Sequence, residues 1–164
     1  MLDGRFVVPG VGGLTFSPPN IFLAISVKQL HIYPDLTYGE YCYIFFTESE
    51  RWANAAASCV RHGKCGMLAS IEDSFEQDFI ARNVKTFHDS YTSFWMGLFK
   101  NTKEEWLWLD RTVMDYTNWR EEQFDSNYGE ISTSDGTWKA DHGFYERPYI
   151  CKTPKGKTIL FHSI

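Results

Sequence analysis

The pattern of apolar positions in residues 38–62 predicts a strand followed by a helix. The stretch "YGEYCYIFF" is rich in aromatic side chains and is typical of a strand. Thr47 and Glu50 have the spacing of a capping box, so the helix is expected to begin there. Gly63 is expected to cap its end. Small and apolar residues recur along one face of this helix: Trp52, Ala55, Ala56, Cys59 and Val60.

A second helix is predicted after the short apolar segment "GMLASI". Asp73 and Glu76 form a second capping-box pair at its start. The helix is expected to end near His88. Its predicted apolar face consists of Phe75, Phe79, Ile80, Val84 and Phe87.

The second half of the chain alternates in a way that favours strands. We predict strands at "SFWMGLF" and "EEWLWLD", with Trp106 and Trp108 on one side of the latter and Leu107 and Leu109 on the other. Residues 110–136 have no clear period and are expected to form a long loop. Two further strands are predicted at "DGTWKA" and "RPYICK". Two helices followed by strands predict an α+β domain.

The ends of the chain differ from this central region. Residues 1–37 form a Gly/Pro-rich extension that we expect to be loop or disordered, and residues 154–164 form a tail. The longest apolar run near the start, "IFLAISV", lacks a preceding basic region and is far shorter than the ~20 residues of a membrane span. We therefore find no convincing signal peptide or membrane span in this chain.

Composition excludes some classes of function. The chain has 164 residues and a formal net charge of −5, and its Lys and Arg residues do not cluster. Both observations argue against nucleic acid as a partner. No nucleophile-elbow, zinc-protease or phosphate-loop motif occurs, so nothing indicates an enzyme.

A series of motifs in residues 38–153 resembles the C-type lectin-like domain, and most closely the domains of the mannose-receptor family. In chain order they are "YCYIFF", "RWANAAASC", "GMLASIEDSFEQDFI", "FWMGL", "WLWLD", "YTNW" and "YICK". The resemblance implies a double-loop fold in which the domain ends pair as strands and two helices flank antiparallel sheets. It implies a non-catalytic binding module on the extracellular or lumenal side of a membrane receptor.

The resemblance also implies a disulfide between Cys59 and Cys151, and we expect the remaining pair, Cys42 and Cys65, to form a second. An alternative is a zinc site, because Cys59, His62 and Cys65 are spaced three residues apart. The disulfide hypothesis is favoured because it also accounts for Cys42 and Cys151.

Sugar-binding members of this family hold calcium through Glu-Pro-Asn or Gln-Pro-Asp in the long loop and Trp-Asn-Asp in the next strand. Here the first tripeptide is Gln123, Phe124 and Asp125, so the proline that favours a cis bond is missing. Lys139 and Ala140 follow Trp138 in place of Asn and Asp, and Asp141 comes one position late. We therefore expect no cofactor, since calcium needs six to eight oxygen ligands.

Two glycines occupy the positions at which the family has a second disulfide. The second family disulfide, at the base of the long loop, would require cysteines at positions 129 and 143, which are Gly129 and Gly143 here. The long loop is thus expected to have been rebuilt away from calcium.

Other residues of this region have two interpretations. Several acids could be calcium ligands, but we expect a solvated loop surface: Glu121, Glu122, Asp125, Glu130 and Asp135. Five tryptophans could stack on a ligand, but their strand positions favour packing: Trp95, Trp106, Trp108, Trp119 and Trp138.

The leading hypothesis is a calcium-independent domain whose ligand is a protein or a neighbouring receptor module. The surface between Arg120 and Asp141 would bind it, with Arg120, Glu122 and Lys139 as candidate contacts. The alternative is calcium-dependent carbohydrate binding through an atypical site that uses Gln123, Asp125 and Asp141. A structural spacer that binds nothing itself is a third possibility.

Overall fold

The computed structural model describes residues 36–62, 66–120 and 125–156. In chain order its elements are β1 (Leu36–Tyr38), β2 (Tyr41–Glu50), α1 (Trp52–His62), β3 (Met67–Leu68), α2 (Ser74–Lys85), β4 (Ser93–Lys100), β5 (Trp106–Trp108), β6 (Tyr128–Ser132), β7 (Trp138–Asp141) and β8 (Arg147–Pro154). The strands pair in the order β1-β2-β8-β4-β6-β7, with β3 added to β8 and β5 to β4. These elements form the predicted α+β fold.

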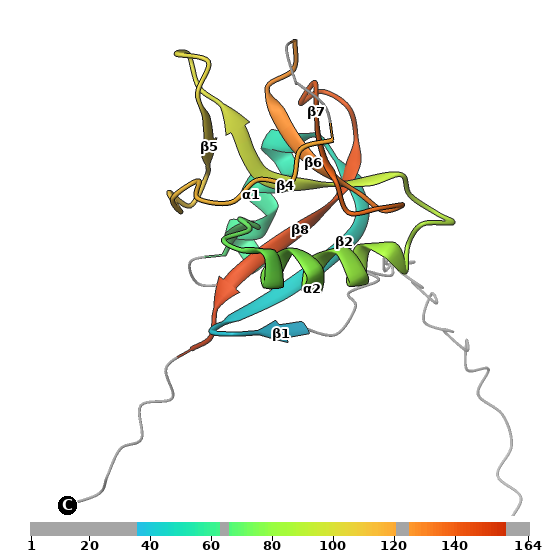
Figure 1. The fold of residues 1–164 in the computed structure, drawn as a ribbon. Helices are drawn as coiled ribbons and strands as arrows, with labels where there is room; N and C mark the ends of the chain where they lie inside the picture. Colours follow the sequence, from blue (N-terminus) through green and yellow to red (C-terminus); the bar gives the residue numbers. More distant parts are fainter. Residues whose placement is uncertain (1–35, 63–65, 121–124, 157–164) are drawn as a thin grey trace, which may run out of the picture.

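The two ends of the domain lie side by side, as the double-loop expectation required. β2 and β8 run antiparallel, and the register places Ile44 opposite Cys151 (Figure 1). The sheet is mixed, because β4 contacts β8 in parallel through Trp95 and Tyr149. At the outer edge, Gly39 has a φ of 52°, and this left-handed conformation closes the two-residue turn between β1 and β2.

The helices cover opposite faces of the sheet because strand side chains alternate. On β8, Ile150 belongs to the core cluster that contains Ile80 and Val84 of α2. Its neighbours Tyr149 and Cys151 belong to the cluster that contains residues of α1. Each helix therefore packs one face against its own side of one sheet. Val60, which was predicted on the apolar face of α1, is an exception, because it is 64% exposed.

The predicted start of α1 at Thr47 is wrong. Residues 47–50 continue β2, where Glu50 pairs with Arg147 of β8, and the helix begins at Trp52. The backbone N–H of Trp52 donates to the carbonyl of Gly143 at 3.0 Å. A distant segment thus satisfies one of the four N–H groups that the start of α1 leaves without an intrahelical partner. The end of the helix at His62 agrees with the prediction.

α2 begins as predicted, and its end comes three residues early. The Asp73 carboxylate accepts hydrogen bonds from the backbone N–H groups of Phe75 and Glu76. The helix ends at Lys85, and Phe87 lies buried in the turn that follows. Phe75 was expected in the apolar face but is 72% exposed, because it lies in the first turn, outside the face formed by Ile80 and Val84.

The four strands predicted in the second half are present as β4, β5, β7 and β8. The predicted sides of β5 are also correct, since Trp108 is buried and Leu107 is exposed. β6 was missed, because it falls within the stretch that had no clear period. Its burial is continuous from Gly129 to Ser132, so the polar Glu130 and Ser132 are buried along with Ile131.

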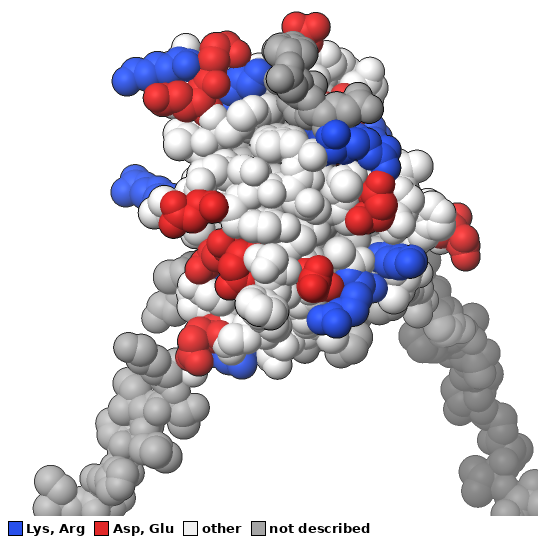
Figure 2. Space-filling view, viewed as in Figure 1, with Lys and Arg blue, Asp and Glu red and all other residues white. Residues whose placement is uncertain are grey.

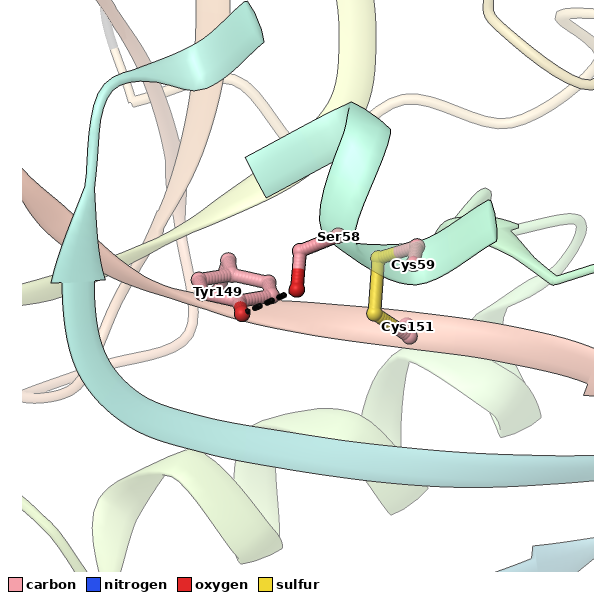
Figure 3. The surroundings of a disulfide bond; sticks show 4 residues. All are labelled: Ser58, Cys59, Tyr149 and Cys151. Atoms are coloured by element: carbon pink, nitrogen blue, oxygen red, sulfur yellow. Dashed lines mark hydrogen bonds between the residues drawn. A yellow bond between two sulfur atoms is a disulfide. The ribbon is translucent and has the colours of Figure 1, made fainter. Parts of the chain in front are cut away.

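The disulfide implied for Cys59 and Cys151 is present and joins α1 to β8 across 92 positions (Figure 3). Beside it, the Tyr149 hydroxyl donates to the Ser58 hydroxyl at 2.8 Å. The zinc alternative is wrong as stated, because the Cys59 sulfur is in this covalent bond. Cys65 lies outside the described residues, so its pairing with Cys42 stays a prediction.

Candidate ligand-binding surface

The predicted surface corresponds to the β6–β7 hairpin and the segment that precedes it. Arg120 is fixed to β7, because its backbone N–H donates to the Trp138 carbonyl at 2.9 Å. Lys139, Ala140 and Asp141 lie on β7 itself. Glu122, Gln123 and Phe124 lie outside the described residues, so their roles stay predictions.

A buried carboxylate lies at the centre of this region. Glu130 of β6 is fully buried, with an exposed fraction of 0%. The Lys139 ammonium lies 2.9 Å from its Oε1 atom, and the Arg147 guanidinium donates to its Oε2 atom at 3.0 Å. The Ser93 hydroxyl also donates to Oε2, at 2.9 Å. Glu130 is therefore held by two cations and a hydroxyl and is not a solvated loop acid, contrary to the sequence-based expectation.

Arg147 extends this network to the end of β7. Its guanidinium donates to the Asp141 carboxylate at 2.7 Å as well as to Glu130. Burial would lower the pKa of Arg147, but its bonds to Glu130 and Asp141 outweigh burial and raise the pKa. Asp141, one of the proposed atypical calcium ligands, is thus already engaged by a permanent cation.

Arg120 forms a second ion pair at the edge of the hairpin. Its guanidinium donates to the Asp135 carboxylate, which also accepts from the backbone N–H and hydroxyl of Thr137. Burial would raise the pKa of Asp135, but the bonds from Thr137 and Arg120 outweigh it and lower the pKa. Both side chains remain partly exposed, so this ion pair lies at the surface of the domain.

The carboxylates of this region do not gather around a common point. Asp125 is exposed, Asp135 pairs with Arg120, and Glu130 pairs with Lys139 and Arg147. Within residues 36–62, 66–120 and 125–156, no group of three or more His, Cys, Asp or Glu side chains could hold a metal ion. On the face seen in Figure 2, acidic and basic side chains lie beside one another and no large patch carries one sign.

The tryptophans are mainly packing residues, as predicted. Trp95, Trp108 and Trp138 are buried. The Trp138 indole N–H donates to the Gln77 side chain of α2 at 2.7 Å, which ties β7 to the helix. Trp106 and Trp119 are only partly buried, and their rings lie 4.8 Å apart.

Neighbouring side chains occupy the space beside Gly129 and Gly143, the two positions at which the family pattern has cysteines. A Cβ atom at Gly129 would lie 2.6 Å from the Cβ atom of Leu98, and one at Gly143 would lie 2.6 Å from the Tyr128 ring. The Tyr128 ring also packs on Trp52, with ring centroids 4.6 Å apart. The space that a disulfide would require is therefore occupied by packed side chains.

Sequence reasoning missed the part played by Arg147 and the burial of Glu130. The only sequence signal was a lone Glu inside "YGEIS", which has the length of a strand but not its alternation. Arg147 lies 17 positions further along the chain and meets Glu130 only because β8 and β6 flank β4 in the sheet. Neither helix among the described residues is long and apolar enough to cross a membrane.

Comparisons with known proteins agree with this architecture. The family model of the lectin C-type domain matches residues 48–153. Regenerating islet-derived protein 3-gamma of Mus musculus is 29% identical over 126 residues, which cover 70% of this chain and 72% of that protein. C-type lectin 9a of Crotalus adamanteus is 30% identical over 128 residues, covering 71% of this chain and 77% of the relative. These relatives do not support the narrower resemblance to the mannose-receptor family.

Solved structures show the same fold. Human lithostathine matches with a TM-score of 0.68 at 23% identity, and the match covers 74% of this chain and 88% of the lithostathine chain. The C-type lectin CEL-I from Cucumaria echinata has a TM-score of 0.66 at 25% identity and covers 71% of this chain and 91% of its own. With the family model matching well over half of its length, the chain belongs to the C-type lectin domain family.

Proposed function

We propose that this chain is a non-catalytic, extracellular ligand-binding domain that acts without calcium and binds a protein, as part of a receptor. The observation that carries the proposal is the Lys139 ammonium, 2.9 Å from the buried Glu130 carboxylate. Lys139 occupies the position where sugar-binding members of the family supply an oxygen ligand.

Electrostatics supports the absence of a calcium requirement. A divalent cation beside Lys139 would meet an ammonium group and would have to compete with it for Glu130. Ala140 carries no side-chain oxygen, and Asp141 is bound by Arg147. Among the described positions, Lys139 and Ala140 offer no side-chain oxygen, and the carboxylates of Glu130 and Asp141 are already paired with cations.

The disulfide supports the extracellular location. Cys59 and Cys151 are both 1% exposed and are joined in the core. Disulfides of this structural kind persist in oxidising compartments such as the cell exterior and the secretory lumen. A non-catalytic role is favoured, because Glu130, Asp135 and Asp141 are engaged in ion pairs and no nucleophile motif accompanies them.

A protein ligand suits the exposed part of this surface. Arg120 and Lys139 are 47% and 40% exposed in their side chains, so each can meet a partner while keeping its internal ion pair. Such half-exposed, oriented cations match the polar rim of a protein interface. Without a metal ion to bind sugar hydroxyls, the carbohydrate alternative lacks its main source of affinity in this family.

Isothermal titration calorimetry with CaCl₂ tests the proposal directly. We expect no saturable heat at millimolar calcium for the natural chain. The double variant Lys139→Asn, Ala140→Asp restores two oxygen-bearing side chains and should bind calcium measurably. The matched control Lys103→Asn changes an exposed lysine outside the hairpin and should not. Saturable calcium binding by the natural chain, together with calcium-dependent sugar binding, would establish the carbohydrate alternative.

A further inference from the structure

A hollow of about 460 Å³ lies between the start of α1 and the segment that joins β7 to β8. Arg51 and Asn54 line it from the helix side, Asn127 and Tyr128 from the start of β6, and Gly143 and Phe144 from the joining segment. The hydrogen bond from the Trp52 backbone to the Gly143 carbonyl holds its two sides together. The hollow is thus built on fixed backbone.

The hollow depends on a substitution that distinguishes this chain from the family pattern. Gly143 lines it, and a Cβ atom there would lie 2.6 Å from the Tyr128 ring. A disulfide at this position would displace Tyr128 from its place against Trp52. The shape of the hollow therefore depends on Gly143, where the family pattern has a cysteine.

Aromatic side chains are exposed at the edge of the hollow, on Phe144, which lines it, and on Tyr145, the next residue. Phe144 is 60% exposed and Tyr145 is 44% exposed. The His142 ring stacks on Phe144 with centroids 5.3 Å apart and an interplanar angle of 7°, and the centroid of the Tyr145 ring lies 4.6 Å from that of Phe144. Arg147 lies over the Tyr145 ring at 5.4 Å, which connects this stack to the Glu130 network.

The polar groups of the hollow are available for a ligand. Within the described part of the chain, the Arg51 guanidinium has no hydrogen-bond or ion-pair partner, and the Asn127 carboxamide has none either. Asn54 uses only its N–H group, toward Glu50 at 3.2 Å, which leaves its carbonyl oxygen unused. An unpaired guanidinium binds a carboxylate through two parallel N–H bonds, and carboxamides bind a peptide backbone.

We propose that this hollow binds a segment of a partner protein in which a carboxylate side chain is followed by an aromatic side chain. Arg51 pairs with the carboxylate, Phe144 and Tyr128 contact the aromatic ring, and Asn127 bonds the backbone between them. An aromatic centre with Arg at its edge has the composition of the energetically dominant part of protein interfaces. The inference rests on the proposed function, since it identifies the chemistry of the protein ligand.

Two capped dipeptides test it by two-dimensional NMR of the ¹⁵N-labelled chain. The probes are acetyl-Asp-Phe-amide and acetyl-Asn-Phe-amide, which differ only in the carboxylate. We expect both to shift the amide signals of Asn54, Asn127, Gly143 and Phe144, and the acidic probe to bind about fivefold more tightly. Arg51→Gln should abolish the difference between the probes, and Phe144→Ala should weaken both at least about fivefold.

Arg61→Gln is the matched control, because Arg61 is also an exposed arginine of the α1 region but does not line the hollow. It should leave both affinities unchanged. Unchanged signals of buried residues such as Ile131 show that each variant is folded. Equal binding of the two probes, shifts outside the hollow, or binding of glucuronic acid without binding of either peptide would overturn the inference. Calcium calorimetry does not involve Arg51, so failure here is distinct from failure of the proposed calcium independence.

Discussion

Lys139 of β7 lies directly opposite Glu130 of β6, and its ammonium group forms an ion pair with one oxygen of the fully buried Glu130 carboxylate. On the other side of the same carboxylate, Arg147 and Ser93 bond to the second oxygen. The two strands of the hairpin are therefore joined by charge as well as by their backbone ladder.

Replacing Glu130 with Gln should destabilise the domain by about 3 kcal/mol, because it leaves Arg147 and Lys139 facing each other without their shared anion. Lys139→Gln should cost about 1 kcal/mol or less, because the Lys139 side chain is 40% exposed and Glu130 keeps Arg147 and Ser93. Urea unfolding at neutral pH measures both values. Equal losses for the two variants would contradict the central position of Glu130.

Removing the disulfide with Cys59→Ala and Cys151→Ala should lower the free energy of unfolding by about 4 kcal/mol, since the bridge closes a long loop in the unfolded chain. That is a large part of the stability of an ordinary domain. Urea unfolding of the double variant measures the loss. Non-reducing peptide mapping of the natural chain should recover the peptides that contain Cys59 and Cys151 cross-linked, and the same map tests the predicted pairing of Cys42 with Cys65.

Gly143→Ala should cost about 1–3 kcal/mol, because the added methyl group meets the Tyr128 ring, which is packed against Trp52. The matched control is Gly156→Ala, where a Cβ atom would have nothing within 4 Å. Combining Gly143→Ala with Tyr128→Ala should cost less than the sum of the single changes. Strict additivity in that double-mutant cycle would show that the ring is not what fills the space.

The free energy of unfolding should fall at alkaline pH because of a buried cluster formed by Lys152, Tyr43 and Glu76. The Lys152 side chain is 3% exposed, and its ammonium lies 2.8 Å from both Glu72 and Glu76. Burial would lower the pKa of Lys152, but the two carboxylates outweigh it and raise the pKa. Burial, together with the hydrogen bond to Glu76, also raises the pKa of the Tyr43 hydroxyl.

Lys152 and Tyr43 carry different charges when protonated, but a raised pKa has the same effect on stability in both cases. The folded state favours the protonated form of each group, so the stabilisation is fully present below the unfolded pKa and is lost as the pH rises through the folded pKa. The unfolded values are about 10 for Tyr and about 10.4 for Lys. We therefore expect the free energy of unfolding to be steady from neutral pH and to decline above about pH 10. Tyr43→Phe should make the decline shallower, leaving the contributions of Lys152 and of Tyr116 and Tyr149, whose pKa values are also raised. A decline of the same slope in this variant would remove Tyr43 from the explanation.

Periodicity was sufficient to identify the elements that bury one apolar face. Ile80 and Val84 of α2, and the alternating Trp and Leu of β5, could be placed correctly because the burial of each depends on its own spacing. The family motifs added the pairing of Cys59 with Cys151, which no local pattern contains. They also identified Lys139 and Ala140 as departures from a calcium site.

β6 and the start of α1 could not be identified from local pattern, because other strands decide both. Glu130 can be buried within β6 only because Lys139 and Arg147 arrive from β7 and β8 to neutralise it. Residues 47–50 remain strand because β8 pairs with them, and Trp52 can begin the helix because Gly143 accepts its backbone N–H. The sequence by itself thus determined most of the buried positions of the helices and of β5, and the departures from the calcium pattern at Lys139 and Ala140, because these depend on residue type and spacing. Only the tertiary structure decided how the remaining charges pair and where the hollow forms, because those depend on contacts between segments far apart in the chain.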